Sequence, residues 1–544
     1  MLRYSRIIAI FVLSALLLSA CNSKPDHRRY IPKDAALVAG INLSSLSKKI
    51  AWNMITGSKL FKEMEKRVPD KNGSDVMSGI DKAGIDVLNT FYVYLKTDTR
   101  FNTGMKVTAL VPLNDASAWE AYIKKNFPKA EIKDHDKLKI ATLDGNMYMG
   151  WNKNLLIIMN VLADNSADMT TEIDNAFSIT DDNSIKATKN FEKLVSAGHD
   201  LSVWVNYDQI VSSYMNDGMA SRMNGVSISK SLWKETAFAC GFDFVKGKIT
   251  GDMTYYTSKG LSDIYKDFGA TNVSKDMIER MPAKDLNMMA AMHFSTTALK
   301  NMMDSTGILG LANSGLSSQG MNVDNILGAF SGDMAFAINN FSMTVVMGDD
   351  HVPEQSADYC MSYIMKINKK ENFQQLMDFA KLNAGLMPMG EGYALPISSH
   401  DSVFVVANND YAVFSNKYNN AAGILHGDNK GQKLPDALKS QFTGHPFAMF
   451  IDVPQTINRL NPGNSISVEE AAIYEESKKL LTDISFNGGE FKDDAMQAHL
   501  EINFTNKDES SIINLLNYGM KISDAMEKSR ARQEKMIDSM AHSF

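Results

Sequence analysis

Alternating apolar and polar positions recur along the chain and predict strands with one face in a core. One such segment runs from Leu201 to Tyr207, and a second runs from Phe447 to Val453. In both, every second residue is apolar, which is the period of a half-buried strand. Each segment follows a Gly-His pair, at Gly198-His199 and at Gly444-His445. The two segments therefore look like copies of one repeated element.

Two more copies of this strand are predicted, after Pro32-Lys33-Asp34 and after Pro282-Ala283-Lys284-Asp285. The positions expected to face the core in the four strands are Leu37, Ala39, Ile41 and Leu43; Leu201, Val203, Val205 and Tyr207; Met288, Ala290, Met292 and Phe294; and Phe447, Met449, Ile451 and Val453. Each strand ends at a polar residue, and a helix-like stretch follows. These polar residues are Asn42, Asn206, His293 and Asp452.

The polar side chains at the strand ends are expected to close the strand-to-helix turns rather than to carry chemistry. His199 and His445 are expected to cap a turn or to satisfy a strand end, because they occupy the same place in two copies. Ser44 and Ser295 are expected to be N-caps of the helices that follow.

Later elements also recur in pairs. A strand followed by a helix is predicted at 105–126 and again at 361–382, and a hairpin at 147–160 and again at 403–416. A second type of hairpin pairs 236–256 with 484–504. The predicted fold class is therefore α+β, with two homologous halves that each contain an antiparallel sheet with interspersed helices.

The repeat sets the expected domain boundaries. The first α+β repeat domain is predicted at 31–270, and the second is predicted at 271–505. A C-terminal helix is expected within 506–544, from about Ser510 to Met536, where apolar residues keep helical spacing. Its apolar side is expected to pack on its own sheet, with docking of a partner as the alternative.

The N-terminus has the pattern of a secretory signal. Arg3 and Arg6 precede an apolar run from Ile7 to Leu18, and small residues then lead into Cys21. This resembles the lipobox of bacterial lipoproteins, which implies a signal peptide at 1–20 and lipidation of Cys21 by acyl chains such as palmitate. The alternative is an uncleaved membrane anchor, but the apolar run is shorter than the roughly 20 residues that a span needs.

Residues 21–30 are predicted to be a tether, because the segment after Cys21 is polar and contains Pro25. The segment is basic rather than acidic, whereas an acidic run after the cysteine resembles a surface-export signal in some lipoproteins. The expected location is the outer membrane, lipid-anchored and facing the periplasm, with the cell surface as the alternative.

The lipobox, the opening Ile31-Pro32-Lys33-Asp34-Ala35-Ala36-Leu37-Val38 and the duplicated body resemble a family of Bacteroidota lipoproteins. This family is catalogued as domain of unknown function 4836. The resemblance implies an outer-membrane-associated lipoprotein without an established activity. It implies no catalytic residue.

Composition narrows the possible partners. The chain has 544 residues, of which 44% are hydrophobic and 22% are charged, and its net charge is -7. A negative charge spread over this length argues against nucleic-acid binding.

Besides Cys21, only Cys240 and Cys360 are present. An oxidising compartment permits a disulfide between them, but buried free thiols are the favoured prediction.

Motifs for catalysis and metal binding are missing. The sequence contains no Gly-x-Ser-x-Gly elbow, no His-Glu-x-x-His helix and no Cys-x-x-Cys pair. Ser-x-x-Lys occurs at Ser45/Lys48 and Ser227/Lys230, but the accompanying Lys-Thr-Gly is absent. The 35 methionines are expected to fill cores, with an apolar groove or Cu(I) binding as alternatives. No enzyme activity, cofactor or metal site is therefore expected.

The function that fits these patterns is a tethered, non-enzymatic binding or scaffolding protein. Its expected contacts are the membrane, through the N-terminal lipid, and a protein or apolar ligand at a cleft between the two halves. The alternatives are a periplasmic carrier or chaperone for lipids and other apolar ligands, or an unrecognised hydrolase.

Overall fold

The computed structural model describes residues 26–50, 82–97, 105–143, 147–161, 169–216, 233–347, 353–398, 401–428, 433–458 and 468–541. These residues divide into two compact units. Unit 1 contains the described residues of 26–43 and 82–197, and unit 2 contains those of 44–50 and 198–541. This boundary differs from the division near residue 270 that the repeat predicts. The two units are defined by compactness and the predicted halves by sequence repetition, so the division into halves stays a prediction.

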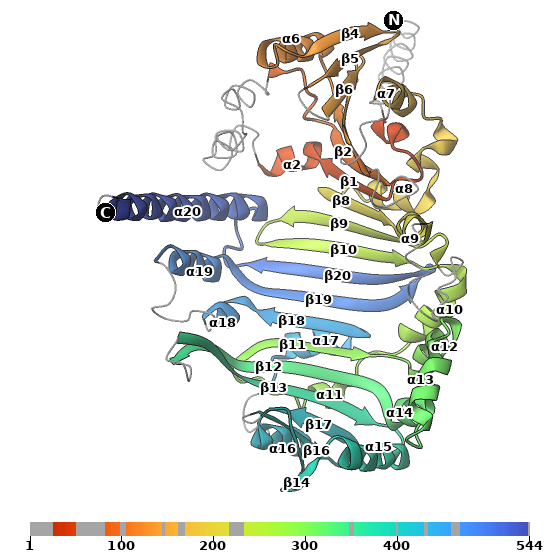
Figure 1. Cartoon of the computed structure of the whole chain (residues 1–544), viewed down its shortest axis with the longest axis vertical. Helices are drawn as coiled ribbons and strands as arrows, with labels where there is room; N and C mark the ends of the chain where they lie inside the picture. Colours follow the sequence, from red (N-terminus) through yellow and green to blue (C-terminus); the bar gives the residue numbers. More distant parts are fainter. Residues whose placement is uncertain are drawn as a thin grey trace, which may run out of the picture. The chain divides into compact units, whose positions relative to one another are not determined.

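Unit 1 is an antiparallel sheet covered by helices (Figure 1). Its strands lie in the order β1 (Leu37–Asn42), β2 (Thr90–Thr97), β3 (Met105–Pro112), β7 (Leu155–Val161), β6 (Met147–Trp151), β5 (Leu138–Thr142) and β4 (Glu131–His135). The helices are α6 (Ala116–Asn126), α7 (Met169–Phe177) and α8 (Lys189–Ser196). Asp115 caps α6 by accepting from the amides of Ser117 and Ala118. Trp119 and Ile123 of α6 then pack in one core with Trp151.

Unit 2 contains a longer antiparallel sheet. Its strands lie in the order β8 (Leu201–Asn206), β9 (Ala237–Val245), β10 (Lys248–Tyr256), β20 (Ala495–Phe504), β19 (Leu481–Lys492), β18 (Phe447–Asp452), β11 (Leu286–His293), β12 (Phe330–Met347), β13 (Pro353–Ile367), β17 (Tyr411–Ser415), β16 (Ser402–Ala407), β15 (Gly392–Pro396) and β14 (Met387–Met389). One of its core clusters includes Met289, Ile364, Val413 and Phe442.

Most helices of unit 2 lie at the two ends of these strands, and the others pack against the sheet (Figure 1). They are α9 (Tyr207–Asn216), α10 (Lys259–Phe268), α11 (Lys275–Ile278), α12 (Thr296–Ser305), α13 (Ile308–Ser317), α14 (Val323–Ala329), α15 (Lys370–Asn383), α16 (Tyr418–His426), α17 (Asp436–Thr443), α18 (Val453–Asn458), α19 (Val468–Leu480) and α20 (Ser511–Ala541). A further helix, α2 (Leu43–Lys49), begins at the last residue of unit 1. The helix predicted from about Ser510 to Met536 is observed as α20.

Strand connectivity recurs along the chain. The order β1-β2-β3-β7-β6-β5-β4 in unit 1 matches the order β11-β12-β13-β17-β16-β15-β14 in unit 2. The meander β8-β9-β10 likewise matches β18-β19-β20. The α+β fold class is confirmed, whereas common descent of the two halves stays a prediction.

The predicted core-facing side is wrong for most positions of the four repeated strands. Val38, Trp204, Met289 with Ala291, and Ala448 are buried on the opposite side from the predicted positions, and of the predicted positions only Val453 is buried. Both sides of these strands carry apolar residues, so alternation did not distinguish them. The buried side has several small residues (Gly40, Ala291 and Ala448), which allow neighbouring elements to approach closely.

The turns after the strands follow the prediction in part. The Asn206 side chain accepts from the Gln209 amide at 3.2 Å, and that of Asp452 accepts from the Gln455 amide at 2.8 Å. Ser295 caps α12 as predicted, by accepting from the Ala298 amide. Ser44 is not an N-cap, because α2 already begins at Leu43.

Candidate N-terminal attachment site

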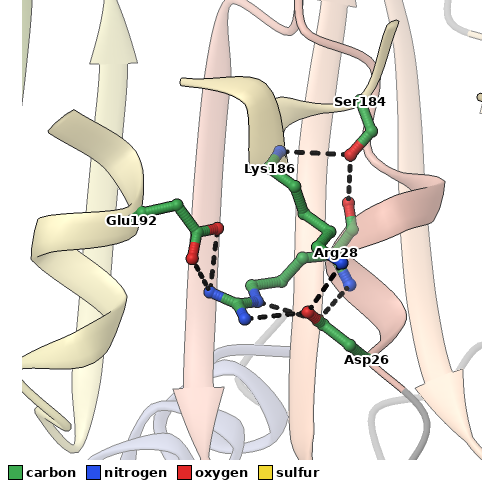
Figure 2. Close-up of polar contacts among 5 residues, drawn as sticks. All are labelled: Asp26, Arg28, Ser184, Lys186 and Glu192. Atoms are coloured by element: carbon green, nitrogen blue, oxygen red, sulfur yellow. Dashed lines mark hydrogen bonds and ion pairs between the residues drawn. The ribbon is translucent and has the colours of Figure 1, made fainter. Parts of the chain in front are cut away.

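A cluster of charged side chains fastens the first described residues to the body of unit 1. The chain enters the fold through a short 3-10 helix, η1 (His27–Tyr30). Asp26 caps this helix by accepting a hydrogen bond from the Arg28 amide at 3.1 Å. Local capping therefore turns the chain so that the Arg28 side chain points toward α8, as Figure 2 shows.

Arg28 bridges two carboxylates. Its Nε and Nη2 each donate to an oxygen of Asp26 at 2.8 Å. Its Nη1 lies 3.0 and 2.9 Å from the two oxygens of Glu192 on α8, which is 164 residues further along the chain (Figure 2). Only a planar guanidinium offers donors in this fork, so lysine could not make the same set of bonds.

Backbone contacts around Ser184 reinforce this attachment. The Ser184 hydroxyl donates to the Arg28 carbonyl at 3.3 Å and accepts from the Lys186 amide at 3.1 Å (Figure 2). The Ile185 amide donates to the Ile31 carbonyl at 2.8 Å, and both isoleucine side chains are fully buried. The partly exposed charged cluster thus lies beside a buried pair of isoleucines and their backbone hydrogen bond.

Electrostatics at the cluster favour one charge state. Burial opposes ionisation of Asp26, but the hydrogen bonds and charge of Arg28 outweigh it, so the pKa of this carboxyl lies below its usual 3.8. Lys186 adds a second cation 3.4 Å from Asp26. His27 is only 5% exposed, and burial holds its pKa below 6.5. Its Nδ1 is buried without a hydrogen-bond partner among the described residues.

These contacts revise one end of the predicted tether. Asp26 to Tyr30 were expected to be linker, yet they are folded into unit 1. The sequence signal that was missed is an N-cap aspartate two residues before an arginine. The partner Glu192 is too distant in sequence to be recognised. Cys21, the rest of the predicted tether to residue 25, and the predicted signal peptide at 1–20 lie outside the described residues.

The repeated histidines both meet carboxylates. His199 Nδ1 lies 2.7 Å from Asp243 Oδ2 on β9, and His445 contacts Glu490 on β19 in the matching place. Next to His199, the fully buried Asp200 accepts from the Phe244 amide at 2.6 Å and pairs with Lys49. These bonds join neighbouring strands, which is the structural role predicted for His199 and His445.

One surface cluster has the residue types of a serine-lysine dyad. Lys366 Nζ lies 3.5 Å from Ser274 Oγ and 4.0 Å from Asp276 Oδ1. Tyr411 also bonds to Asp276, and Arg280 stacks 4.7 Å above the Tyr411 ring. Lys366 is therefore part of an ion pair, whereas a dyad needs a neutral amine as base. The cluster is better suited to hold the start of α11 in place.

Other site types can be judged only for the part of the chain that is described. There, no group of three or more His, Cys, Asp or Glu side chains could hold a metal ion. Within the same residues, no helix has the length and apolar character needed to cross a bilayer.

Cys240 is buried, Cys360 is partly buried, and both are free thiols, so no disulfide joins them.

A cavity of about 510 Å³ lies between α19 and α20. Its lining includes Glu476, Lys479, Tyr518 and Lys521. Both lysines pair with Glu476, and the Tyr518 hydroxyl lies 2.6 Å from Ser477 Oγ. These polar groups already satisfy one another, so the cavity does not present a converging set of free donors or acceptors.

Comparison with known proteins identifies the family but no activity. Solved structures of TP0453 in crystal forms IV and III are 7% and 6% identical to this chain, with a TM-score of 0.27 for each. They cover 42% and 46% of this chain, and the matches cover 80% and 90% of the TP0453 chains. No curated protein matches. A family model matches residues 28–420, which is more than half of the chain, and the protein therefore belongs to the family described as Domain of unknown function (DUF4836).

Proposed function

We propose that this protein is a lipoprotein of the outer membrane, anchored through acyl chains on Cys21, and that it acts by binding or scaffolding rather than by catalysis. The observation that supports the anchor is the position of the Arg28 cluster. Asp26 follows Cys21 by only five residues. At about 3.6 Å per residue, the segment between them reaches at most about 18 Å.

Because the segment between Cys21 and Asp26 is short, we expect the Arg28 cluster to bear mechanical load. A lipid on Cys21 would transmit any pull on the body to the first folded residues. The fork of Arg28 between Asp26 and Glu192 spreads such a load from η1 to α8. One acyl chain binds membranes only marginally, so durable anchoring needs several chains on the cysteine.

The matching strand orders support a second part of the proposal. We infer that the two halves are copies of one ancestral α+β module, so that the chain offers two similar surfaces to partners. A protein that binds or organises partners needs binding surfaces and a defined location in the cell, but no catalytic site. The expected address is the periplasmic side of the outer membrane, which protease treatment of intact cells would test.

Labelled palmitate in growing cells tests the anchor. The wild-type chain should take up label and stay in the membrane fraction, whereas Cys21→Ala should lose the label and become extractable without detergent. Cys240→Ala and Cys360→Ala are matched controls and should keep the label. A wild-type chain without label, or a Cys21→Ala chain that remains as firmly bound, would overturn the proposal.

In-cell crosslinking tests the scaffolding role. A bifunctional reagent applied to intact cells should trap a defined protein partner with the wild-type chain. If repeated experiments at native expression levels recover only the uncrosslinked chain, a scaffolding role is rejected while the anchor is unaffected.

A further inference from the structure

An uncharged segment stands out in unit 2. Residues 305–323 contain no Asp, Glu, Lys, Arg or His, although 22% of the whole chain is charged. Helix α13 (Ile308–Ser317) lies inside this segment. At 100° per residue its apolar side chains fall on one side together with Gly315, and small polar residues and Gly310 fall on the other. The first set is Ile308, Leu309, Leu311, Ala312 and Leu316; the second is Gly310, Asn313, Ser314 and Ser317.

The structure leaves part of this apolar side uncovered. No residue of α13 is buried, and Ile308 and Leu311 are 41% and 55% exposed. A side chain on Gly315, which lies on the same side, would meet nothing within 4 Å. The polar side of α13 is bonded to α14 through one residue. The Asn313 side chain accepts a hydrogen bond of 2.9 Å from the Val323 amide at the start of α14.

Its neighbours in unit 2 are packed differently. Ala298 of α12 is fully buried and belongs to a core cluster with Leu261 and Ile264 of α10. Both Val323 and Ala329 of α14 are buried. Figure 1 shows these helices together beyond one end of the strands of unit 2. Of α12, α13 and α14, only α13 therefore has no buried residue.

We infer that α13 binds the lipid–water interface of a bilayer, with Ile308 and Leu311 inserted among the lipids. The occupant is a lipid surface because the whole segment is free of charge, and its polar side is limited to serine, asparagine and glycine. Binding of an interfacial helix depends on apolar area and on attraction between cationic side chains and anionic lipids. With no cation in the segment, α13 can use only the first of these.

Because only apolar area contributes to binding, the dependence of membrane association on salt, lipid charge and curvature can be predicted. Association should not depend on salt or on anionic lipid, because no charge takes part. It should be stronger on highly curved vesicles, where gaps between headgroups expose acyl chains. The inference rests on the proposed lipid anchor only in that the anchor keeps a bilayer within reach of the body.

Vesicle flotation of the full chain carrying Cys21→Ser tests the inference without the anchor. The probe is neutral phosphatidylcholine, in small and in large vesicles. The chain should float with small vesicles more than with large ones, at low and high salt alike. Adding Ile308→Ser and Leu311→Ser together should reduce binding on the order of tenfold or more, because two inserted side chains are lost.

Leu382→Ser is the matched control, because Leu382 is 85% exposed at the end of α15 and lies outside the segment. It should float like the parent, and circular dichroism should be unchanged in all variants. Four results would each overturn the inference: no flotation of the parent, equal flotation of the double variant, binding that needs anionic lipid, or a dimer that the double variant dissociates without any lipid binding. None of these bears on palmitate labelling of Cys21, so the two proposals fail separately.

Discussion

His499 and Asp252 face each other across β10 and β20 at equivalent positions of two hairpins. Their side chains lie 2.8 Å apart, and they are register partners in the antiparallel pair. Each lies four residues beyond the first residue of its strand, Lys248 in β10 and Ala495 in β20. They therefore lie near the middle of the antiparallel ladder that joins the two hairpins edge to edge.

Carboxylates around His499 should differ in their contribution to stability. Burial opposes ionisation of Glu501, but bonds from Lys248 and His499 outweigh it and lower the pKa of this carboxyl. The side chain of Asp252 is more exposed and pairs with His499. We expect Glu501→Gln to cost about 1 kcal/mol at pH 7 and Asp252→Asn to cost less than about 0.5 kcal/mol.

Chemical denaturation at two pH values checks this difference. A carboxyl with a lowered pKa stabilises the fold above its unfolded-state pKa, and the contribution is lost as pH falls through the folded-state pKa. The cost of Glu501→Gln should therefore shrink in strong acid. An equal cost at acidic and neutral pH would contradict the ion-pair explanation.

Removing the Arg28 fork should loosen the N-terminal end of unit 1. Arg28→Met removes the cation that Asp26 and Glu192 share, and we expect a loss of about 2 kcal/mol. Arg28→Lys should recover only part of it, because an ammonium cannot bond both carboxylates in the same geometry. Hydrogen exchange at the Ile31 and Ile185 amides should quicken accordingly.

A double-mutant cycle with Glu192→Gln measures the interaction free energy between Arg28 and Glu192. The coupling between Arg28→Met and Glu192→Gln should be on the order of 1 kcal/mol. Arg29→Met is the control, because Arg29 is exposed and stacks on Tyr30. Strict additivity of the cycle would show that the Arg28–Glu192 contact does not stabilise the fold.

His27 should make unit 1 sensitive to mild acid. Burial lowers its folded-state pKa below 6.5, so the neutral ring stabilises the fold at pH 7 and this contribution is lost as pH falls below 6.5. One such group adds a slope of at most about 1.4 kcal/mol per pH unit. In His27→Phe, the stability measured between pH 7 and pH 5 should fall less steeply than in the wild type. Parallel curves would mean that His27 is not the responsible group.

Gly241 should not tolerate a side chain. A Cβ at this position on β9 would lie 2.0 Å from Cδ2 of His199, the ring that pairs with Asp243. Gly241→Ala should therefore displace His199 and cost about 1–3 kcal/mol. Gly423→Ala on α16 is the control, because its Cβ would meet nothing within 4 Å, and it should stabilise by about 0.5–1 kcal/mol. A harmless Gly241→Ala would mean that His199 is free to move.

Sequence periodicity was sufficient for the α+β class, the recurring strands and the role of Asn206 and Asp452 at strand ends. It failed to choose the buried side of those strands, because Leu37, Val38 and Ala39 are all apolar and alternation gives no preference. It also missed the Arg28–Glu192 contact, since such a pair is made by the fold and not by neighbouring residues. Ser44 was mistaken for a cap because propensity does not fix the first residue of a helix.

The place of β20 between β10 and β19 has a consequence for how the chain folds. Until the C-terminal strand is synthesised, the meander β8-β9-β10 and the second set of strands have no hydrogen-bonded ladder between them. Closing this gap joins residues about 250 positions apart, a large loop-closure entropy that makes the step slow. Nascent or truncated chains therefore expose two unpaired strand edges, which are open to aggregation and to capture by chaperones.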